Sequence, residues 1–455
     1  MNIRIKNAEF LLWEPDCHIA KGEILVSNGL IVSVEDLTAC SGGQANVGRA
    51  GEDFAADKVI DGSGKLIIPG LVNSHTHAYM SFFRNYADDL PFDDWLFKKI
   101  MPAEDKIKSE EAYWCNLLSC LEMIKTGTTC FADMHMFKHQ SVRAALDSGM
   151  RAVISRGLAG KSVDDSGAKR RLDEAFEEME AVRGNTAQEK AAPGNALQGE
   201  SRLSFMLAPH AIYSCGEALL RELPDIAIEK NLGINIHIAE SRNEFDESVK
   251  KNGRSPVAYL DSLDFFRART LAAHCVHITD EDIGILAARG VSVATNPVSN
   301  MKLGNGFAPV SKLLAAGVNV CVGTDSAASN NSLNMFRELS MLSYIHKGID
   351  KNALSLSAEL TLRLVVQGGA KALGLDGKIG GIEAGKKADL VLIDLDKPWL
   401  QPVNNSISSL VYSANGSEAD TVIIDGEVIM EKGRVNTLDE DRIIYEVNKM
   451  AKRIL

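Results

Sequence analysis

Two histidines separated by a single residue, His75 and His77, end the apolar run PGLVNS. In an extended strand, residues i and i+2 point to the same side, so both imidazoles can reach one metal ion. A lone His-Thr-His arises readily by chance in a chain with 10 histidines. The pair therefore indicates a metal site only if other candidate ligands lie at the same edge of the sheet.

Further candidate ligands end other apolar runs. His237 follows GINI, His274 follows TLAA, and Asp325 follows VNVCVGT. Imidazole nitrogens together with a carboxylate oxygen suit zinc or iron(II) better than calcium or magnesium. The spacing therefore predicts one metal site, with ligands drawn from these three residues and the histidine pair.

An acidic residue lies close to one of these histidines. Glu240 follows His237 by three residues in HIAE, where the predicted strand gives way to its loop. A carboxyl group there can pass protons between a bound water and a substrate. The alternative is a solvated loop glutamate, which the neighbouring His237 makes the weaker interpretation.

Eight short apolar runs alternate with helical periodicity between about residues 66 and 326. They are KLIIPGLVNSH, GTTCFADMH, RAVISRG, LSFMLAPH, GINIHIAE, TLAAHCVH, VSVATNP and VNVCVGTD. Nearly continuous apolar runs are typical of parallel strands covered on both faces. Most end in polar residues, as do barrel strands whose βα loops form an active site. We therefore expect an α/β protein with a (β/α)8 barrel, and a doubly wound sheet is the disfavoured alternative.

Both ends of the chain contain short strand patterns of a different kind. IRIKNAEFLL and GEILVSNGLIVSVED lie near the start, and ADLVLIDLD and DTVIIDGEVIMEKGRV lie near the end. Neither set can build a convincing core alone. We expect one small β-sandwich made from residues 1–65 and 379–455, the second part ending in a helix, beside a barrel at residues 66–378.

Composition excludes several partners. The 455 residues are 45% hydrophobic and 24% charged, which is typical of a globular protein with a large core. The net charge of −12 disfavours nucleic acid and anionic membranes. There is no signal-peptide pattern at the start, no window of about eighteen apolar residues, and no CxxC pair among the eight cysteines. We expect a cytoplasmic protein with reduced thiols that binds neither nucleic acid nor membrane.

Longer motifs surround the candidate ligands. They are PGLVNSHTHAYMSFFRNYADDLPFDDWLFKKIMPAED, APHAIYSC, HIAES, AAHCVH and NPVSNMKLGNGFAPVSKLLAAGVNVCVGTDSAASNN. Together they resemble the amidohydrolase superfamily, most closely its 5′-methylthioadenosine/S-adenosylhomocysteine deaminase branch. The resemblance implies one zinc ion per chain, with iron(II) as the alternative. The ligands that it implies are His75, His77, His237 and Asp325. No lysine ends the third or fourth run, so the bridging carbamylated lysine of binuclear relatives has no counterpart.

The same resemblance implies hydrolytic deamination of an adenosine-type nucleoside. The substrate would be 5′-methylthioadenosine, S-adenosylhomocysteine, adenosine or 5′-deoxyadenosine, and the products would be the inosine analogue and ammonia. Asp325 would accept a proton from the metal-activated water, and His274 would orient or stabilise the resulting hydroxide. Glu240 would deliver a proton to N1 of the adenine during attack at C6. Glu240 and Asp325 would thus also contact the substrate.

Substrate-binding residues follow from the resemblance alone. Glu104, in MPAED, would accept hydrogen bonds from the ribose hydroxyls, and His210, in APH, would contact the sugar or its 5′ group. Arg156 corresponds to a family arginine that reaches a neighbouring subunit's site. Arg171, with Arg170 as its alternative, corresponds to a second arginine for the amino-acid carboxylate of S-adenosylhomocysteine. The resemblance therefore implies a homo-oligomer.

Two other functions compete with this one. A related deaminase or hydrolase could act on another ring, such as guanine, a pterin, cytosine or a chlorinated triazine. Glu104 discriminates against it, because a free base has no ribose for that carboxylate to hold. A non-catalytic scaffold on the same barrel would have broken ligands, whereas all four and Glu240 are present.

Overall fold

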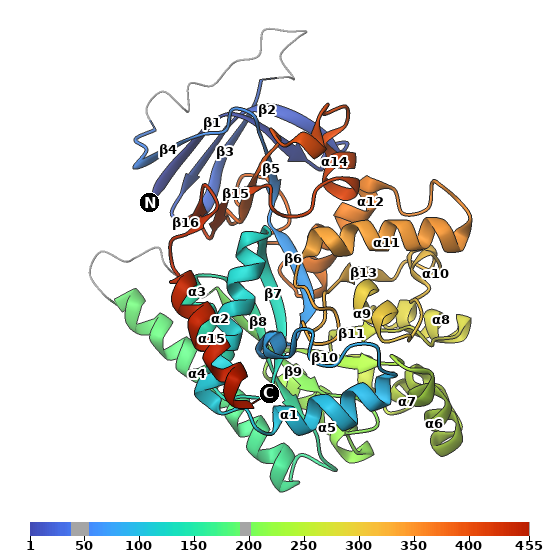
Figure 1. Cartoon of the computed structure of the whole chain (residues 1–455). Helices are drawn as coiled ribbons and strands as arrows, with labels where there is room; N and C mark the ends of the chain where they lie inside the picture. Colours follow the sequence, from blue (N-terminus) through green and yellow to red (C-terminus); the bar gives the residue numbers. More distant parts are fainter. Residues whose placement is uncertain (38–53, 192–201, 455) are drawn as a thin grey trace.

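The computed structural model describes residues 1–37, 54–191 and 202–454. A barrel of parallel strands surrounded by helices forms the larger part, and a second sheet built from both chain ends lies against one end of it (Figure 1). The seven cysteines in these ranges are free thiols. Among the same residues, no helix combines the length and apolar character needed to cross a membrane.

Eight parallel strands, hydrogen-bonded in sequence order, form the barrel. They are β6 (Leu71–Thr76), β7 (Thr128–His135), β8 (Arg151–Leu158), β9 (Leu203–Pro209), β10 (Gly233–Ile238), β11 (Thr270–His274), β12 (Ser292–Thr295) and β13 (Asn319–Val322). Nearly every residue of these strands is buried, which explains their continuous apolar runs. The predicted α/β barrel is confirmed.

The first and last strands meet and nearly close the barrel. Just beyond β13, the Asp325 backbone N–H donates to the His75 carbonyl at 2.9 Å. The Thr324 N–H donates to the side chain of Asn73 at 3.0 Å. Closure therefore places Asp325 directly beside the His-Thr-His segment.

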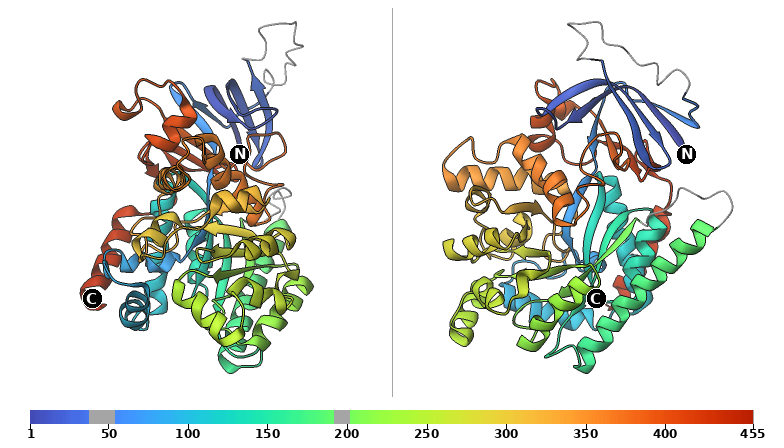
Figure 2. Two further views of the ribbon diagram at one scale, coloured as in Figure 1. Left: turned by 90° about the vertical axis from the view of Figure 1, so that its right-hand side faces the viewer. Right: turned by 180° about the vertical axis from the view of Figure 1, so that it is seen from behind.

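Most of the described helices surround the barrel (Figure 2). The described helices are α1 (Met101–Glu104), α2 (Ser109–Lys125), α3 (Gln140–Ser148), α4 (Ser166–Ala191), α5 (Glu217–Glu229), α6 (Arg242–Asn252), α7 (Pro256–Ser262), α8 (Asp280–Ala288), α9 (Pro297–Lys302), α10 (Val310–Ala315), α11 (Met335–Asp350), α12 (Ala358–Arg363), α13 (Gly369–Ala372), α14 (Ser406–Tyr412) and α15 (Glu440–Ile454). Of these, α14 packs against α11 and α12. The amphipathic α15 packs against α2, and Met450 buries its side chain beside the 3-10 turn Ala78–Phe83 and the π-helical turn Asp94–Ile100.

The two chain ends form one mixed sheet of nine strands. Its strands are β1 (Asn2–Leu12), β2 (His18–Ser27), β3 (Leu30–Asp36), β4 (Lys58–Asp61), β5 (Lys65–Pro69), β14 (Leu390–Asp394), β15 (Ala419–Ile424), β16 (Glu427–Glu431) and β17 (Arg434–Val435). Antiparallel pairing of β5 with β14 joins the two ends. The structure confirms a separate strand unit built from both chain ends, and this unit is one mixed sheet.

One apolar run is divided between the two sheets. Gly70 separates the two strands of KLIIPGLVNSH, with β5 in the chain-end sheet and β6 in the barrel. A Cβ at Gly70 would lie 1.9 Å from Thr129 Oγ1, so this close approach requires glycine. The sequence does not mark the division, because both halves are equally apolar.

Alternate side chains of β5 pack into two different hydrophobic cores, one on each side of the chain-end sheet. Ile68 packs in the core shared with the barrel, whereas Ile67 packs with Leu390 in the chain-end sheet's own core. A buried ion pair adds to the contact, with Arg151 Nε 2.6 Å from Asp389 Oδ2. The chain-end sheet therefore supports the barrel from which the site residues project.

Candidate active site

A cavity of about 390 Å³ opens at the carboxyl ends of the barrel strands. It is lined by polar residues from several βα loops and by a wall of apolar side chains. The polar ones include His77, Glu104, Arg171, His210, His237, Glu240, His274 and Asp325, and the apolar wall includes Phe92, Trp95, Leu96, Ile100 and Met136. Eight predicted site residues that lie far apart in the sequence therefore line one cavity.

The candidate metal ligands converge beside this cavity. His77 Nε2 lies 3.2 Å from His237 Nε2, and Asp325 Oδ1 lies 3.7 Å from His75 Nε2 and 3.6 Å from His77 Nε2. Ligand atoms about 2.1 Å from a tetrahedral ion would be about 3.4 Å apart. His75 is completely buried and neither ring nitrogen has a hydrogen-bond partner. The donor set and its spacing fit a metal ion of the zinc type.

Hydrogen bonds orient two of these imidazoles. The Nδ1 atoms of His77 and His237 lie 2.8 Å and 2.7 Å from the carbonyl oxygens of Met134 and His210. Donation from Nδ1–H leaves each Nε2 lone pair free to face the other ligands. Burial, reinforced by neighbouring imidazoles, lowers the pKa of His75 and His237 well below 6.5. Neutral imidazoles are the form that binds metal.

Asp325 is held as a carboxylate. Its Oδ2 accepts hydrogen bonds from the hydroxyls of Ser299 and Ser329, both at 2.7 Å, and its Oδ1 faces the histidines. Burial alone would raise the pKa of Asp325, but the imidazoles of His274 and His77 and their neighbours lower it to about 2. An ionised oxygen is therefore available beside the ligands.

Glu240 and His274 face each other across the cavity. His274 Nε2 lies 3.6 Å from Glu240 Oε2, and the Asn305 side chain donates to Glu240 Oε1 at 3.3 Å. His274 Nδ1 lies 2.9 Å from Asn300 Oδ1. Burial, followed by the charge of Asp325, raises the pKa of Glu240 well above 4.5. One cavity thus holds two carboxyl groups whose pKa values are shifted in opposite directions, the arrangement used in acid–base catalysis.

Three other predicted residues line the same cavity. Glu104 is partly buried at the end of α1, and the Tyr79 hydroxyl donates to its Oε1. Burial raises the pKa of Glu104, and that hydrogen bond opposes the change. His210 Nδ1 lies 3.0 Å from Ser214 Oγ, and burial with neighbouring charges lowers the pKa of His210 to about 4. Arg171 contributes a guanidinium to the same wall.

The three candidate arginines occupy different positions. Arg156 does not line the cavity, because its buried guanidinium pairs with Glu174 at 2.8 Å and donates to the His135 carbonyl at 3.3 Å. Arg170 is exposed and lies 3.7 Å from the same glutamate. Of the two arginines weighed for the second position, only Arg171 lines the cavity in this chain.

Sequence reasoning missed the residues that orient the site. Ser299 and Asn300, on α9, contact Asp325 and His274, and Ser329 contacts Asp325 from the loop after β13. Their signal was the polar NPVSN segment directly after the seventh apolar run. Such a segment is also typical of an ordinary loop, so only the structure shows its contacts.

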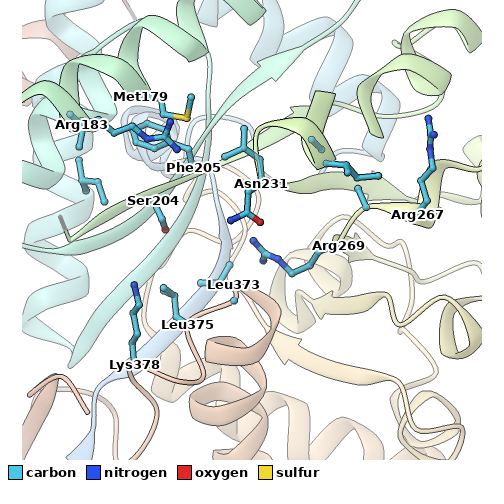
Figure 3. Close-up of a pocket in the computed structure, with 17 residues that line it drawn as sticks. Met179, Arg183, Ser204, Phe205, Asn231, Arg267, Arg269, Leu373, Leu375 and Lys378 are labelled. Carbon is cyan, nitrogen blue, oxygen red and sulfur yellow. The ribbon is translucent and has the colours of Figure 1, made fainter. Parts of the chain in front are cut away.

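A second cavity, of about 760 Å³, lies at the opposite end of the barrel (Figure 3). Its walls include Leu203 at the start of β9, Arg269 just before β11, Arg183 and Lys378. No histidine, cysteine, aspartate or glutamate is among its described lining residues. The metal-binding and proton-transfer candidates belong to the smaller cavity at the carboxyl ends.

Fold and site together are those of a metal-dependent barrel hydrolase: a parallel barrel with histidine and aspartate ligands at its carboxyl-terminal mouth. Residues 66–429 match the Amidohydrolase family. The chain belongs to this family.

Full-length relatives are similar to the whole chain. A 5-methylthioadenosine/S-adenosylhomocysteine deaminase of Caldanaerobacter subterraneus subsp. tengcongensis is 44% identical over 100% of this chain and 99% of its own length. The protein of the same name from Thermoanaerobacter pseudethanolicus is 41% identical over the full length of both. An adenosine deaminase from Xanthomonas campestris, solved with bound zinc, superimposes with a TM-score of 0.88 at 31% identity, covering 99% of this chain and 98% of that one.

Proposed function

We propose that this protein is a metal-dependent aminohydrolase that converts adenosine-type nucleosides to inosine analogues and ammonia. The observation that carries the proposal is the juxtaposition, in one cavity, of a histidine–aspartate cluster, the buried Glu240 and the partly buried Glu104. The full-length similarity to 5-methylthioadenosine/S-adenosylhomocysteine deaminases supports those two nucleosides as substrates, with adenosine and 5′-deoxyadenosine as further candidates.

One zinc ion per chain is the metal that we propose, with iron(II) as the alternative. His75, His77, His237 and Asp325 would hold it, because their ligand atoms are spaced as a tetrahedral ion requires. When bound, it supplies Lewis-acid activation of a water molecule. The zinc in the similar adenosine deaminase supports this choice.

The protein's own groups then move the protons. The Asp325 carboxylate accepts a proton as the water oxygen bonds to C6 of the purine, and Glu240 gives its proton to N1. Asp325 then passes its proton to the exocyclic nitrogen, the C6–N6 bond breaks and ammonia leaves. The C6 hydroxyl proton goes to Glu240, which restores its carboxyl group and leaves the C6 carbonyl of the inosine analogue. His274, oriented by Asn300, keeps its Nε2 toward Glu240 and the reacting water.

For the nucleoside, we assign Glu104 to the ribose hydroxyls and His210 to the sugar or its 5′ substituent. Arg171 is positioned to meet an anionic 5′ group in its own cavity. Arg156 would act in the cavity of a neighbouring subunit of a homo-oligomer, which requires release from its ion pair with Glu174. We further propose a cytoplasmic location and no nucleic-acid partner.

A deamination screen tests this function. Adenosine, 5′-deoxyadenosine, 5′-methylthioadenosine and S-adenosylhomocysteine would be compared with guanine, a pterin, cytosine and a chlorinated triazine by ultraviolet absorbance. Glu240→Gln keeps the size of the side chain but cannot transfer a proton, so kcat should fall by a factor on the order of 10² with unchanged metal content. Preference for a free base over every adenosine derivative would replace the nucleoside assignment.

A further inference from the structure

The turn that carries Glu240 has a strained backbone. Between β10 and α6, Ala239 adopts a φ of 52°, in the left-handed region that residues with a Cβ rarely enter. Such a conformation persists only where surrounding contacts hold it. The position of Glu240 therefore depends on what binds the backbone of this turn.

A second glutamate binds that backbone. Glu244, in the first turn of α6, is only 7% exposed, and its Oε1 and Oε2 accept the N–H groups of Ala239 and Glu240 at 3.0 Å and 2.9 Å. In return, the Ser241 hydroxyl at the helix N-cap accepts the Glu244 N–H at 3.2 Å. Both carboxylate oxygens are therefore used to hold the turn.

The arrangement differs from an ordinary capping box. In such a box, the acidic side chain at the third helical position bonds to the N–H of the N-cap residue itself. Helix α8 of this chain follows that pattern, with Asp282 accepting the Thr279 N–H at 2.8 Å. Glu244 instead reaches past the N-cap to the two residues before it, one of which is Glu240. Helix capping alone does not explain that reach.

The other side of the same turn is tied to the loop after β11. The Ala239 carbonyl accepts the N–H groups of Val276 and His277 at 3.1 Å and 2.9 Å. This loop begins directly after His274, whose Nε2 faces the Glu240 carboxyl at 3.6 Å. The turn thus sets the distance between the two catalytic side chains.

We propose that Glu244 is a positioning residue for proton transfer, holding the Ala239–Glu240 backbone so that the Glu240 carboxyl faces His274 and the substrate. The inference rests on the proposed deaminase function, in which Glu240 carries the proton to the purine. Glu244 itself contacts neither the metal ligands nor the cavity within the described residues.

Two substitutions and a matched control test it. Glu244→Gln keeps one acceptor oxygen and Glu244→Ala keeps none, so kcat should fall on the order of tenfold and a hundredfold respectively, because each lost hydrogen bond loosens the backbone that positions Glu240. Metal content should stay near that of the unaltered protein, and KM should change less than threefold. Glu247→Gln is the control, because Glu247 lies on the same helix but is exposed and pairs with Lys250.

A double-substitution cycle separates positioning from general stabilisation. If Glu244 acts through Glu240, adding Glu244→Ala to Glu240→Gln should cost little further kcat, because the proton carrier is already missing. Losses that multiply in the double variant would overturn the proposal. So would a lower Tm with kcat per metal-loaded protein within twofold of the unaltered value.

Amide hydrogen exchange tests the same contact without any substrate. Peptides that contain Ala239 and Glu240 should exchange faster in Glu244→Ala and not in Glu247→Gln, because the two N–H groups lose their acceptor. Unchanged exchange would overturn the proposal. If the unaltered protein deaminates no adenosine derivative, the proposed function fails, and the exchange result still decides whether Glu244 holds the turn.

Discussion

Removal of the Glu104 carboxylate is the most direct test of how this cavity recognises a nucleoside. Glu104 is partly buried, and Tyr79 donates a hydrogen bond to its Oε1, whereas no described donor bonds to Oε2. That oxygen is the acceptor left for a ribose hydroxyl. A hydrogen bond to a charged group contributes about 2 kcal/mol, which corresponds to a factor of about 30 in kcat/KM at 25 °C.

The assay compares Glu104→Ala with the unaltered protein on adenosine and 2′-deoxyadenosine. The unaltered protein should disfavour the deoxynucleoside by about 30-fold, because a partly buried carboxylate is left without its partner. The variant should lose about that factor on adenosine and little on 2′-deoxyadenosine. Asp105→Ala, at the exposed neighbouring position, should change neither value.

A further control accounts for the hydroxyl that Glu104→Ala leaves unpartnered. Tyr79 is 3% exposed, so its orphaned hydroxyl could disturb the cavity by itself. Tyr79→Phe removes that hydroxyl and should keep the preference for adenosine. Equal losses on both nucleosides in Glu104→Ala would refute the assignment of the ribose to this carboxylate.

Three further predictions concern the metal, the 5′ substituent and stability. The purified protein should carry about one zinc or iron per chain, and chelation or His75→Ala should abolish activity; a fully active metal-free preparation would contradict the site. Arg171→Gln should lower kcat/KM for S-adenosylhomocysteine on the order of tenfold more than for 5′-methylthioadenosine, because only the former carries a carboxylate. Arg156→Gln should have the same effect if Arg156 serves a neighbouring subunit. Equal losses on both substrates would mean that both arginines support the loop structure instead. Burial raises the pKa of Glu338 from 4.5 to about 8 against the hydrogen bond from Asn330. Since the folded protein then binds this proton more tightly, its contribution to stability is complete below pH 4.5 and is lost as the pH rises through 8, with a slope of up to about 1.4 kcal/mol per pH unit. Denaturation of Glu338→Gln should show a flatter dependence across this range, and an unchanged slope would contradict the role of Glu338.

The barrel was predictable because its strands are buried on both faces and therefore form continuous apolar runs. All eight runs contain barrel strands. What the runs do not specify is hydrogen-bond pairing. Leu66 and Ile68, in β5, have the same apolar character as Leu71 and Val72, in β6, yet the two strands belong to different sheets. Pairing with strands far away in the chain decides between them, because β5 pairs with β14 and β6 pairs with β7.

Sequence spacing determined the parts of the site that are local in the chain. His75 and His77 share a side because a strand alternates with period two, and Glu240 lies near His237 because the strand ends between them. The types of these residues already indicated metal binding and proton transfer, because imidazole and carboxylate groups supply both. Periodicity and side-chain chemistry act over a few residues, so one sequence suffices to read them.

Tertiary structure alone decided how the distant parts meet. Asp325 lies beside His75 because β13 closes against β6, and Arg171 rather than Arg170 lines the cavity because of how the start of α4 packs. Glu244 accepts hydrogen bonds from Ala239 and Glu240, the two residues before the helix N-cap, and these bonds also depend on a backbone conformation that no sequence motif specifies. These contacts arise from packing among segments far apart in the chain, and the pattern of any one segment carries no information about its neighbours in space.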